Sequence, residues 1–395
     1  MTAPSTGTSA HRFGRFCVAC FLLSMAYGAT FLLSLLVRSF GASEREAGQV
    51  FAVAMVSTLI AVLGSGHVLQ RLGAPRCIAL GAVCLVIASA GFAVVPGLGI
   101  GFFILGVGWG LFYTVGPIMV VAMVEPSRRT HCFALLSGSM LSGIGSGPLL
   151  GKLAGFAGLP VQTAFAFAAV AAVLGGLYFW RLGAREETRM RSSERVQISL
   201  KATAQVMRSP SGLSILMVGL GGAVFGVMGS FQTSYATSLG LDYSLFFIGF
   251  MGAAIVCRLL IAKWVVQRNP FLASCVLTSL MLIAVIGFGE WVHDSLGYLL
   301  TAALLGVGYG LNYSVINGLA ANEAPPGLTA QALLLFSLSY FMGVFGFPFI
   351  AGKLISHTGV PGMLLGVGLA AALVWVLSVG RWLFWRFTRT EQVAR

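Results

Sequence analysis

One positive charge lies inside an apolar stretch of this sequence, and its position suits it to chemistry. Arg258 occurs in GAAIVCRLLIAKW, several residues before a hydrophobic run ends. An arginine in the middle of a membrane helix costs about 2.5–3.5 kcal/mol on insertion scales, so such charges tend to be functional. Its planar fork of donors matches a carboxylate through paired, charge-assisted hydrogen bonds. Two alternatives stay open, which are that Arg258 extends to the nearby membrane surface or that it bonds to backbone carbonyl groups.

Acidic and metal-binding side chains are not arranged for catalysis. Glu125, Glu290, Glu323 and Asp242 stand at the ends of apolar runs, and the histidines are scattered without metal-ligand spacing. The CVAC sequence at Cys17–Cys20 lies in an apolar stretch without the context of a redox motif. We therefore expect no enzymatic activity, no cofactor and no metal ion.

The composition indicates a protein that lies mostly within a lipid bilayer. Hydrophobic residues make up 57% of the sequence and charged residues 9%, whereas soluble domains have about 25% charged residues. Apolar runs of about 20 residues, the length of a membrane-crossing helix, recur along the chain. Alternating β-barrel strands do not fit these runs. The fold class predicted is an all-α polytopic membrane protein with twelve transmembrane helices.

The twelve predicted spans are 13–38, 44–66, 76–95, 99–123, 131–154, 160–182, 211–238, 243–266, 270–291, 296–320, 328–354 and 360–385. They give a tail (1–12), an N-terminal six-helix bundle (13–183), a central loop (184–210), a C-terminal six-helix bundle (211–386) and a second tail (387–395). In the central loop, apolar residues among polar ones indicate either a short helix on the membrane surface or a solvated linker.

Basic residues predict the orientation of these spans. With both termini on one side, nineteen of the 24 basic residues fall on that side and four near the other. The positive-inside rule then places both termini in the cytoplasm. The expected location is the cell (inner or plasma) membrane. The net charge of +13 reflects this topology and attraction to anionic membrane lipid, so no nucleic-acid partner is expected.

The chain contains an internal repeat about 200 residues apart. LGVGWGLFYTVGPI from Leu105 corresponds to LGVGYGLNYSVING from Leu305, and eight of the fourteen residues are identical. The segment GPLLGKLAGFAGLP from Gly147 similarly corresponds to FPFIAGKLISHTGVP from Phe347. Parallel repeats of six helices, with a substrate site between them, are typical of transporters.

With these features the whole chain resembles the major facilitator superfamily. GHVLQRLGAPR, from Gly66 to Arg76, is similar to the loop motif of that family between helices 2 and 3. Gly66, Arg71 and Gly73 match the motif, but Gln70 replaces its acidic residue. The charge pair that helps to close the cytoplasmic gate in relatives is therefore absent. Phe102 stands where many proton-coupled relatives have an arginine.

A stripe of small residues follows one face of the fifth predicted helix. GIGSGPLLG resembles a pattern associated with antiporters and contains Gly143, Gly147, Pro148 and Gly151. Small residues spaced by four let helix backbones approach closely in lipid. Because the resemblance places helices 5 and 8 together, the stripe predicts either a moving seam with helix 8 or static packing. The Gly-x-Gly-x-Gly triplets of helices 4 and 10 are interpreted as packing or flexing sites.

The resemblance implies that helices 1, 4, 7 and 10 line a central cavity. Candidate substrate-binding residues on those helices and on helix 8 are Tyr27, Trp109, Tyr113, Gln232, Asn312, Tyr313, Asn317 and Arg258. For the aromatic residues, core packing is the alternative, and interface anchoring for those near span ends.

The predicted function is secondary active transport of a small organic solute by alternating access, with a weak preference for an organic anion. One alternative is a proton-coupled drug or metabolite efflux antiporter. Another is a transporter-like receptor or scaffold without flux. The expected partners are the solute, a coupling ion such as a proton or a counter-substrate, and membrane lipid, and the expected state is a monomer.

Overall fold

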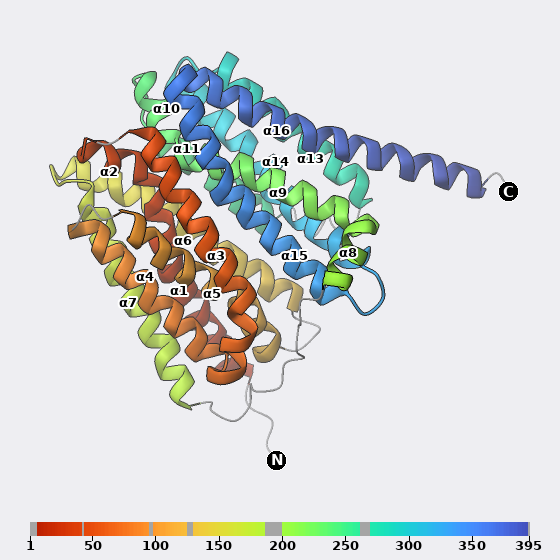
Figure 1. Cartoon of the computed structure of the whole chain (residues 1–395), viewed down its shortest axis with the longest axis horizontal. Coiled ribbons are helices and arrows are strands. Elements are labelled where there is room, and N and C mark those ends of the chain that lie inside the picture. The colour runs from red at the N-terminus through yellow and green to blue at the C-terminus, as the bar shows by residue number, and fades with distance from the viewer. Residues whose placement is uncertain are drawn as a thin grey trace. The chain divides into compact units, whose positions relative to one another are not determined.

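The structure is a computed structural model that describes residues 6–41, 43–94, 98–124, 129–185, 200–260 and 269–393 (Figure 1). Within these ranges the regular elements are all helices, and no strand occurs. The helices form two compact units. Unit 1 comprises Met1–Phe40 and Val53–Arg195, and unit 2 comprises Gly41–Ala52 and Val196–Arg395.

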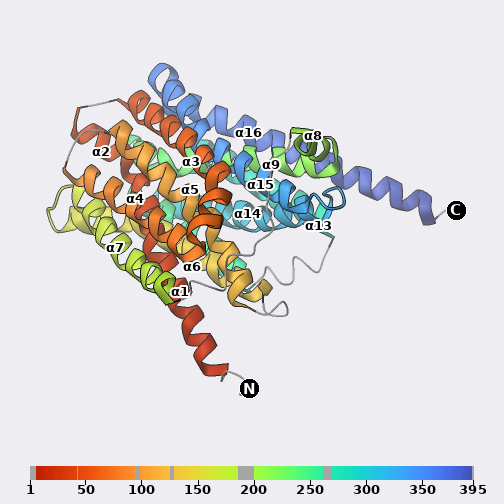
Figure 2. The ribbon, with the colours of Figure 1, turned by 60° about the horizontal axis from the view of Figure 1, so that its bottom comes forward.

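The helices of the first half of the chain succeed one another with short connections. They are α1 (Thr6–Ala29), the 3₁₀ turn η1 (Thr30–Leu32), α2 (Leu33–Ser39), α3 (Glu44–Leu72), α4 (Ala74–Val94), α5 (Leu98–Met123), α6 (Arg129–Phe156) and α7 (Gln162–Arg185). In unit 1, α4 packs along α7, as both views show (Figures 1 and 2), and α1 packs along α6. The start of α3 belongs to unit 2, although the predicted N-terminal bundle includes it.

The second half repeats this order after a short extra helix. Its elements are α8 (Leu200–Arg208), α9 (Pro210–Ser230), α10 (Gln232–Ser238), α11 (Ser244–Leu260), α13 (Pro270–Glu290), α14 (Ser295–Asn322), α15 (Thr329–Phe341), the π-helical turn η3 (Met342–Gly346) and α16 (Phe347–Val393). The helix α8 lies in the predicted central loop, where it packs against α9 and α15 and buries Val206 completely.

The apolar content of the helices is sufficient for a membrane protein. In the part of the chain that the structure describes, nine helical segments are long and apolar enough to span a membrane, and Ser244–Arg258 is a shorter apolar helix. Large apolar side chains such as Leu174, Trp180 and Leu369 are more than half exposed. Such broad apolar surfaces are uncommon on soluble monomers, so these faces fit lipid.

Helix α16 contains a break that divides it into two helical parts. Gly359 has φ 74°, a left-handed conformation in a helix that otherwise runs from Phe347 to Val393. The corresponding turn in unit 1 has Gly158 at φ 68°. These glycines explain the repeated segment near Pro160 and Pro361, because a side chain is strained at such φ values.

The first helix of each half is interrupted at a corresponding place. In unit 1 the 3₁₀ turn Thr30–Leu32 follows α1, and the Thr30 hydroxyl donates to the Tyr27 carbonyl oxygen at 2.6 Å. In unit 2 Phe231 separates α9 from α10 with φ −110° and ψ 11°. The sequence predicts continuous spans here (13–38 and 211–238), because the apolar runs continue through both breaks.

Candidate functional site

The glycine triplet of α5 places this helix against two neighbours at once. A Cβ atom on Gly106 would overlap the Ser57 hydroxyl of α3, and one on Gly110 would lie 3.0 Å from Ala61 of the same helix. A Cβ atom on Gly108 would lie 2.6 Å from the carbonyl oxygen of Gly81 in α4. Residues two apart point to opposite sides of a helix, so alternating glycines allow close packing on both sides.

Unit 2 repeats this packing with the corresponding glycines of α14. Gly306 lies against Phe250 of α11, and Gly310 lies against Ala254 of the same helix. A Cβ atom on Gly308 would lie 2.6 Å from the backbone nitrogen of Met281 in α13. The repeated glycines therefore serve the predicted packing role.

An aromatic pair connects α5 to α1, and a corresponding pair connects α14 to α9. In unit 1, Trp109 stacks on Tyr27 of α1 with ring centroids 4.4 Å apart and an angle of 15° between planes. In unit 2, Tyr309 stacks on Phe225 of α9 with centroids 5.1 Å apart and an angle of 5°. Stacked pairs of this kind are worth about 0.5–1.5 kcal/mol beyond the area they bury. Each unit thus joins its first and fourth helices by the same contact.

The aromatic residues of unit 1 differ in how much surface remains for a solute. Tyr27 and Trp109 are each only 2% exposed, because they cover one another. Tyr113 is half-buried, and its ring centroid lies 5.7 Å from that of Trp109. Of the three unit 1 residues predicted to bind the substrate, Tyr113 therefore has the most surface available for contact with a solute.

Arg258 lies within a cluster of aromatic residues in unit 2. The side chain is half-buried, and its Nε donates a hydrogen bond to the Gly310 carbonyl oxygen at 3.1 Å. Its guanidinium carbon lies 5.9 Å from the ring centre of Tyr313, which in turn packs on Phe336 and Tyr340 of α15. Bonding to a backbone carbonyl was one of the alternatives for Arg258, and this contact is present. We define Arg258, Tyr313 and Tyr340 as the cationic cluster.

Two predicted substrate ligands instead make hydrogen bonds inside unit 2. The Asn312 side-chain oxygen accepts from the Ser274 hydroxyl at 2.9 Å, and Ser274 also lies 3.1 Å from the hydroxyl of Ser378. The Gln232 side-chain oxygen accepts from the Tyr298 hydroxyl at 2.7 Å. Asn312 is 4% exposed and Gln232 is fully buried. Both amides therefore accept hydrogen bonds from buried hydroxyl groups of unit 2. The sequence alone could not identify these partners. Asn317 is half-buried on α14.

The glycine stripe of α6 packs against α1 within unit 1. Cβ atoms on Gly143 and Gly147 would overlap the backbone of Phe21 and Gly28, and one on Gly151 would collide with Leu32. Pro148 is buried beside them within the helix. The prediction that this face meets helix 8 is therefore corrected, because α1 occupies it. On α11, Gly249 likewise packs against α14.

The loop motif forms the end of α3. Gly73 has φ 77°, and its backbone N–H donates to the Leu69 carbonyl oxygen at 2.9 Å, which closes the helix. Gln70 and Arg71 are exposed, and no heavy atom lies within 4 Å of a Cβ atom built on Gly66. The glycine at position 73 is explained by the backbone conformation alone.

An ion pair at one end of unit 2 was missed by the sequence analysis. Arg381 of α16 donates from Nη2 to both carboxylate oxygens of Glu323, at 2.6 and 2.5 Å, and from Nη1 to the Ser214 hydroxyl at 2.8 Å. The two charged side chains are 9% and 18% exposed. The pair connects the ends of α9, α14 and α16. The partners are 58 residues apart, so only their shared location at predicted cytoplasmic span ends hinted at the contact.

The repeated helical units and their apolar outer faces fit a polytopic membrane protein. The profile of the Major Facilitator Superfamily matches residues 16–348. The chain belongs to this superfamily of membrane transporters. A comparison with curated proteins gives no match.

Proposed function

We propose that this protein is a secondary active transporter that moves a small organic solute across the inner membrane by alternating access. The supporting observation is the pair of units with matching helix order, matching glycine contacts and matching aromatic pairs. Units built as parallel repeats can rock around a site between them. Division of α16 at Gly359 supports a count of twelve spans in two six-helix repeats.

The proposed topology has both termini in the cytoplasm. Its support is the distribution of basic residues, nineteen against four, under the positive-inside rule. Reporter fusions after Ala184 and after Arg395 test it. Both fusions are expected to report a cytoplasmic location, and a periplasmic signal at either position would overturn the twelve-span proposal.

Within this function we propose an organic anion, such as a carboxylate, as the solute class. The cationic cluster places the half-buried Arg258 charge beside Tyr313. The carboxylates in the described ranges occupy helix ends: Glu44, Glu46, Asp242, Glu290, Asp294, Glu323 and Glu391. A guanidinium group in an apolar helix attracts an anion, and each net hydrogen bond to a charged group contributes about 1.5–3 kcal/mol.

Counterflow of labelled solutes in proteoliposomes tests both proposals. We expect Arg258→Lys to weaken anion affinity while anion preference remains, because lysine keeps the charge but loses the planar fork. Arg258→Gln is expected to lose anion uptake and still insert into the membrane. Arg208→Gln, which removes an exposed cation of α8, is the matched control and should transport normally.

The alternatives give different results in the same assay. Preference for a cationic drug, unchanged in Arg258→Gln, would contradict the anion proposal and favour the efflux antiporter. Absence of counterflow with any solute that stabilises the protein would favour the receptor or scaffold. The position of Phe102, fully buried against Phe92 where proton-coupled relatives have arginine, favours exchange of substrates over proton coupling.

A further inference from the structure

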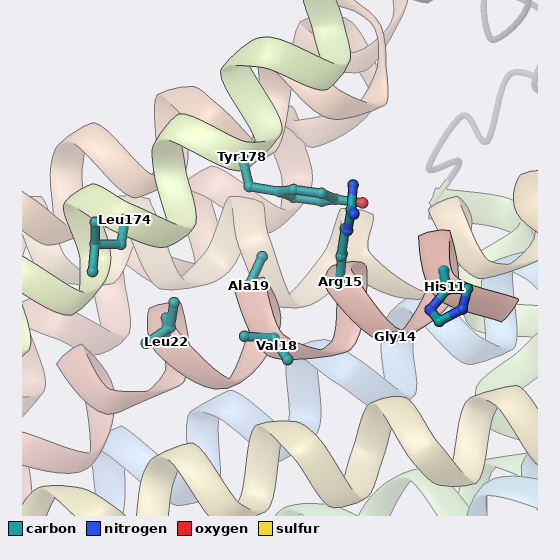
Figure 3. Close-up of a pocket in the computed structure, with 8 residues that line it drawn as sticks. All are labelled: His11, Gly14, Arg15, Val18, Ala19, Leu22, Leu174 and Tyr178. Carbon is teal, nitrogen blue, oxygen red and sulfur yellow. The ribbon is translucent and has the colours of Figure 1, made fainter. Parts of the chain in front are cut away.

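A groove on the outer side of unit 1 runs between the first part of α1 and the second part of α7. Figure 3 shows the residues that line it: His11, Gly14, Arg15, Val18, Ala19, Leu22, Leu174 and Tyr178. The volume of the groove is about 500 Å³. None of these eight residues belongs to the aromatic pair or to the glycine contacts described above.

The lining of the groove changes from polar to apolar along its length. On α1, residues 11, 15, 18 and 22 share one helix face, so His11 and Arg15 are followed by Val18 and Leu22. On α7, Leu174 precedes Tyr178 by one turn. Val18 is 59% exposed and Leu174 is 55% exposed, so the apolar part of the groove faces the surroundings of the protein rather than its core.

The polar end of the groove is held in shape by contacts between the two helices. The Tyr178 hydroxyl donates to the backbone carbonyl oxygen of Arg12 at 3.4 Å. Beneath it, Phe16 and Phe179 pack edge to face with centroids 5.9 Å apart. Figure 3 shows the guanidinium group of Arg15 beside the hydroxyl end of Tyr178, with His11 further along the same helix. In the described part of the chain, no carboxylate forms an ion pair with Arg15.

We propose that this groove binds an anionic phospholipid, with its phosphate on Arg15 and an acyl chain along Val18, Leu22 and Leu174. The charge and the polarity of the lining match the two parts of such a lipid. Arg15 and Leu22 are seven residues apart, which is about 10 Å of helix and suits the upper part of an acyl chain. Basic pockets between membrane helices on the cytoplasmic side are suited to anionic headgroups. The predicted topology places Arg15 on that side.

Two variants test the polar end of the groove, one by removing its charge and one by filling its space. Arg15→Gln removes the charge and keeps a polar side chain. Gly14→Leu keeps the charge and fills the groove, and the helix tolerates it because no heavy atom lies within 4 Å of a Cβ atom at this position. Arg208→Gln is the control, because it removes one exposed cation from the same predicted side of the membrane without touching the groove.

Native mass spectrometry of the full-length purified protein measures the binding. The probes are phosphatidylglycerol and phosphatidylcholine with identical acyl chains. We expect the wild-type protein to retain phosphatidylglycerol preferentially, and Arg15→Gln to bind it about fivefold more weakly, the factor expected for one cation near an anionic headgroup. Gly14→Leu should weaken binding by at least as much, whereas Arg208→Gln should bind as the wild type does. Circular dichroism and size-exclusion profiles identify any variant that misfolds.

Three results would overturn the proposal. Equal loss in Arg15→Gln and Arg208→Gln would indicate diffuse attraction to charge. Equal retention of both lipids would indicate unselective contact with the bilayer. Displacement of phosphatidylglycerol by inorganic phosphate would indicate a site for a free anion.

Discussion

The glycine triplets predict a specific pattern of stability changes when single methyl groups are added. We expect Gly308→Ala in α14 to destabilise unit 2, because the new Cβ atom would lie 2.6 Å from the Met281 backbone nitrogen. Gly318→Ala is the matched control on the same helix, since no heavy atom lies within 4 Å of its Cβ position. In unit 1, Gly108 and Gly116 of α5 form the equivalent pair.

The magnitude follows from the distance that the neighbouring helix must move. Carbon atoms in van der Waals contact lie about 3.5–4.0 Å apart, so α13 must shift by roughly 1 Å or more. Overpacking of this kind costs about 1–3 kcal/mol. Alanine is favoured over glycine inside a helix by about 1 kcal/mol, so the open control position should gain stability. Because the gain from alanine applies at both positions, it cancels, and the two variants of each pair should differ by the overpacking cost of about 1–3 kcal/mol in free energy of unfolding.

Reversible denaturant unfolding of the purified protein in detergent micelles measures these differences. The tight position is expected to lose stability in both units, and the open position to hold or gain it. Equal effects of Gly308→Ala and Gly318→Ala would refute the packing argument, because the two substitutions are chemically identical and differ only in their neighbours. A difference in one unit but not in the other would refute the structural equivalence of the two repeats.

Three further predictions concern other contacts. Glu323→Gln should lower the free energy of unfolding by about 2–4 kcal/mol, because it leaves the largely buried Arg381 charge without its carboxylate. A double-mutant cycle with Arg381→Gln should give a coupling energy above about 1 kcal/mol. An additive result would contradict the ion pair. Gly147→Leu should prevent close packing of α6 on α1 and reduce the yield of folded protein, whereas Gly155→Leu on an open part of the same helix should not; normal yield for both would contradict the contact. Asn312→Leu should destabilise the protein by about 1–3 kcal/mol, since it breaks a buried hydrogen bond. It should leave KM for the transported solute unchanged. A raised KM in counterflow would instead indicate that Asn312 contacts the solute.

The candidate site was predictable in part from single residues. Arg258 is recognisable because an arginine in an apolar run is costly wherever it points. Packing was also one of the two roles predicted for the glycine triplets, since glycines inside a span have no side chain and allow helices to approach closely. Tyr27 and Trp109 were selected as residues of helices 1 and 4, but the sequence could not show that they stack on one another.

One expectation was wrong because it depended on which way a helix face points, whereas the binding role of Asn312 stays a prediction. The stripe at Gly143, Gly147 and Gly151 was correctly expected to allow close approach, yet its neighbour is α1. Asn312 was selected because an amide in lipid needs partners, and its partner is the hydroxyl of Ser274. A small or polar residue in a membrane helix indicates that another group packs against it, but the sequence does not identify that group.

The sequence by itself determined the membrane class, the helical elements and the internal repeat, because these depend on composition, run length and order along the chain. Only the tertiary structure decided the breaks after α1 and α9, the contact between Arg381 and Glu323, and the partners of each glycine face. The physical reason is that membrane helices are apolar on every side, so hydrophobic periodicity does not distinguish the side that faces lipid from the side that faces another helix. Helix rotation is then set by steric fit and by a few polar contacts between residues far apart in the chain.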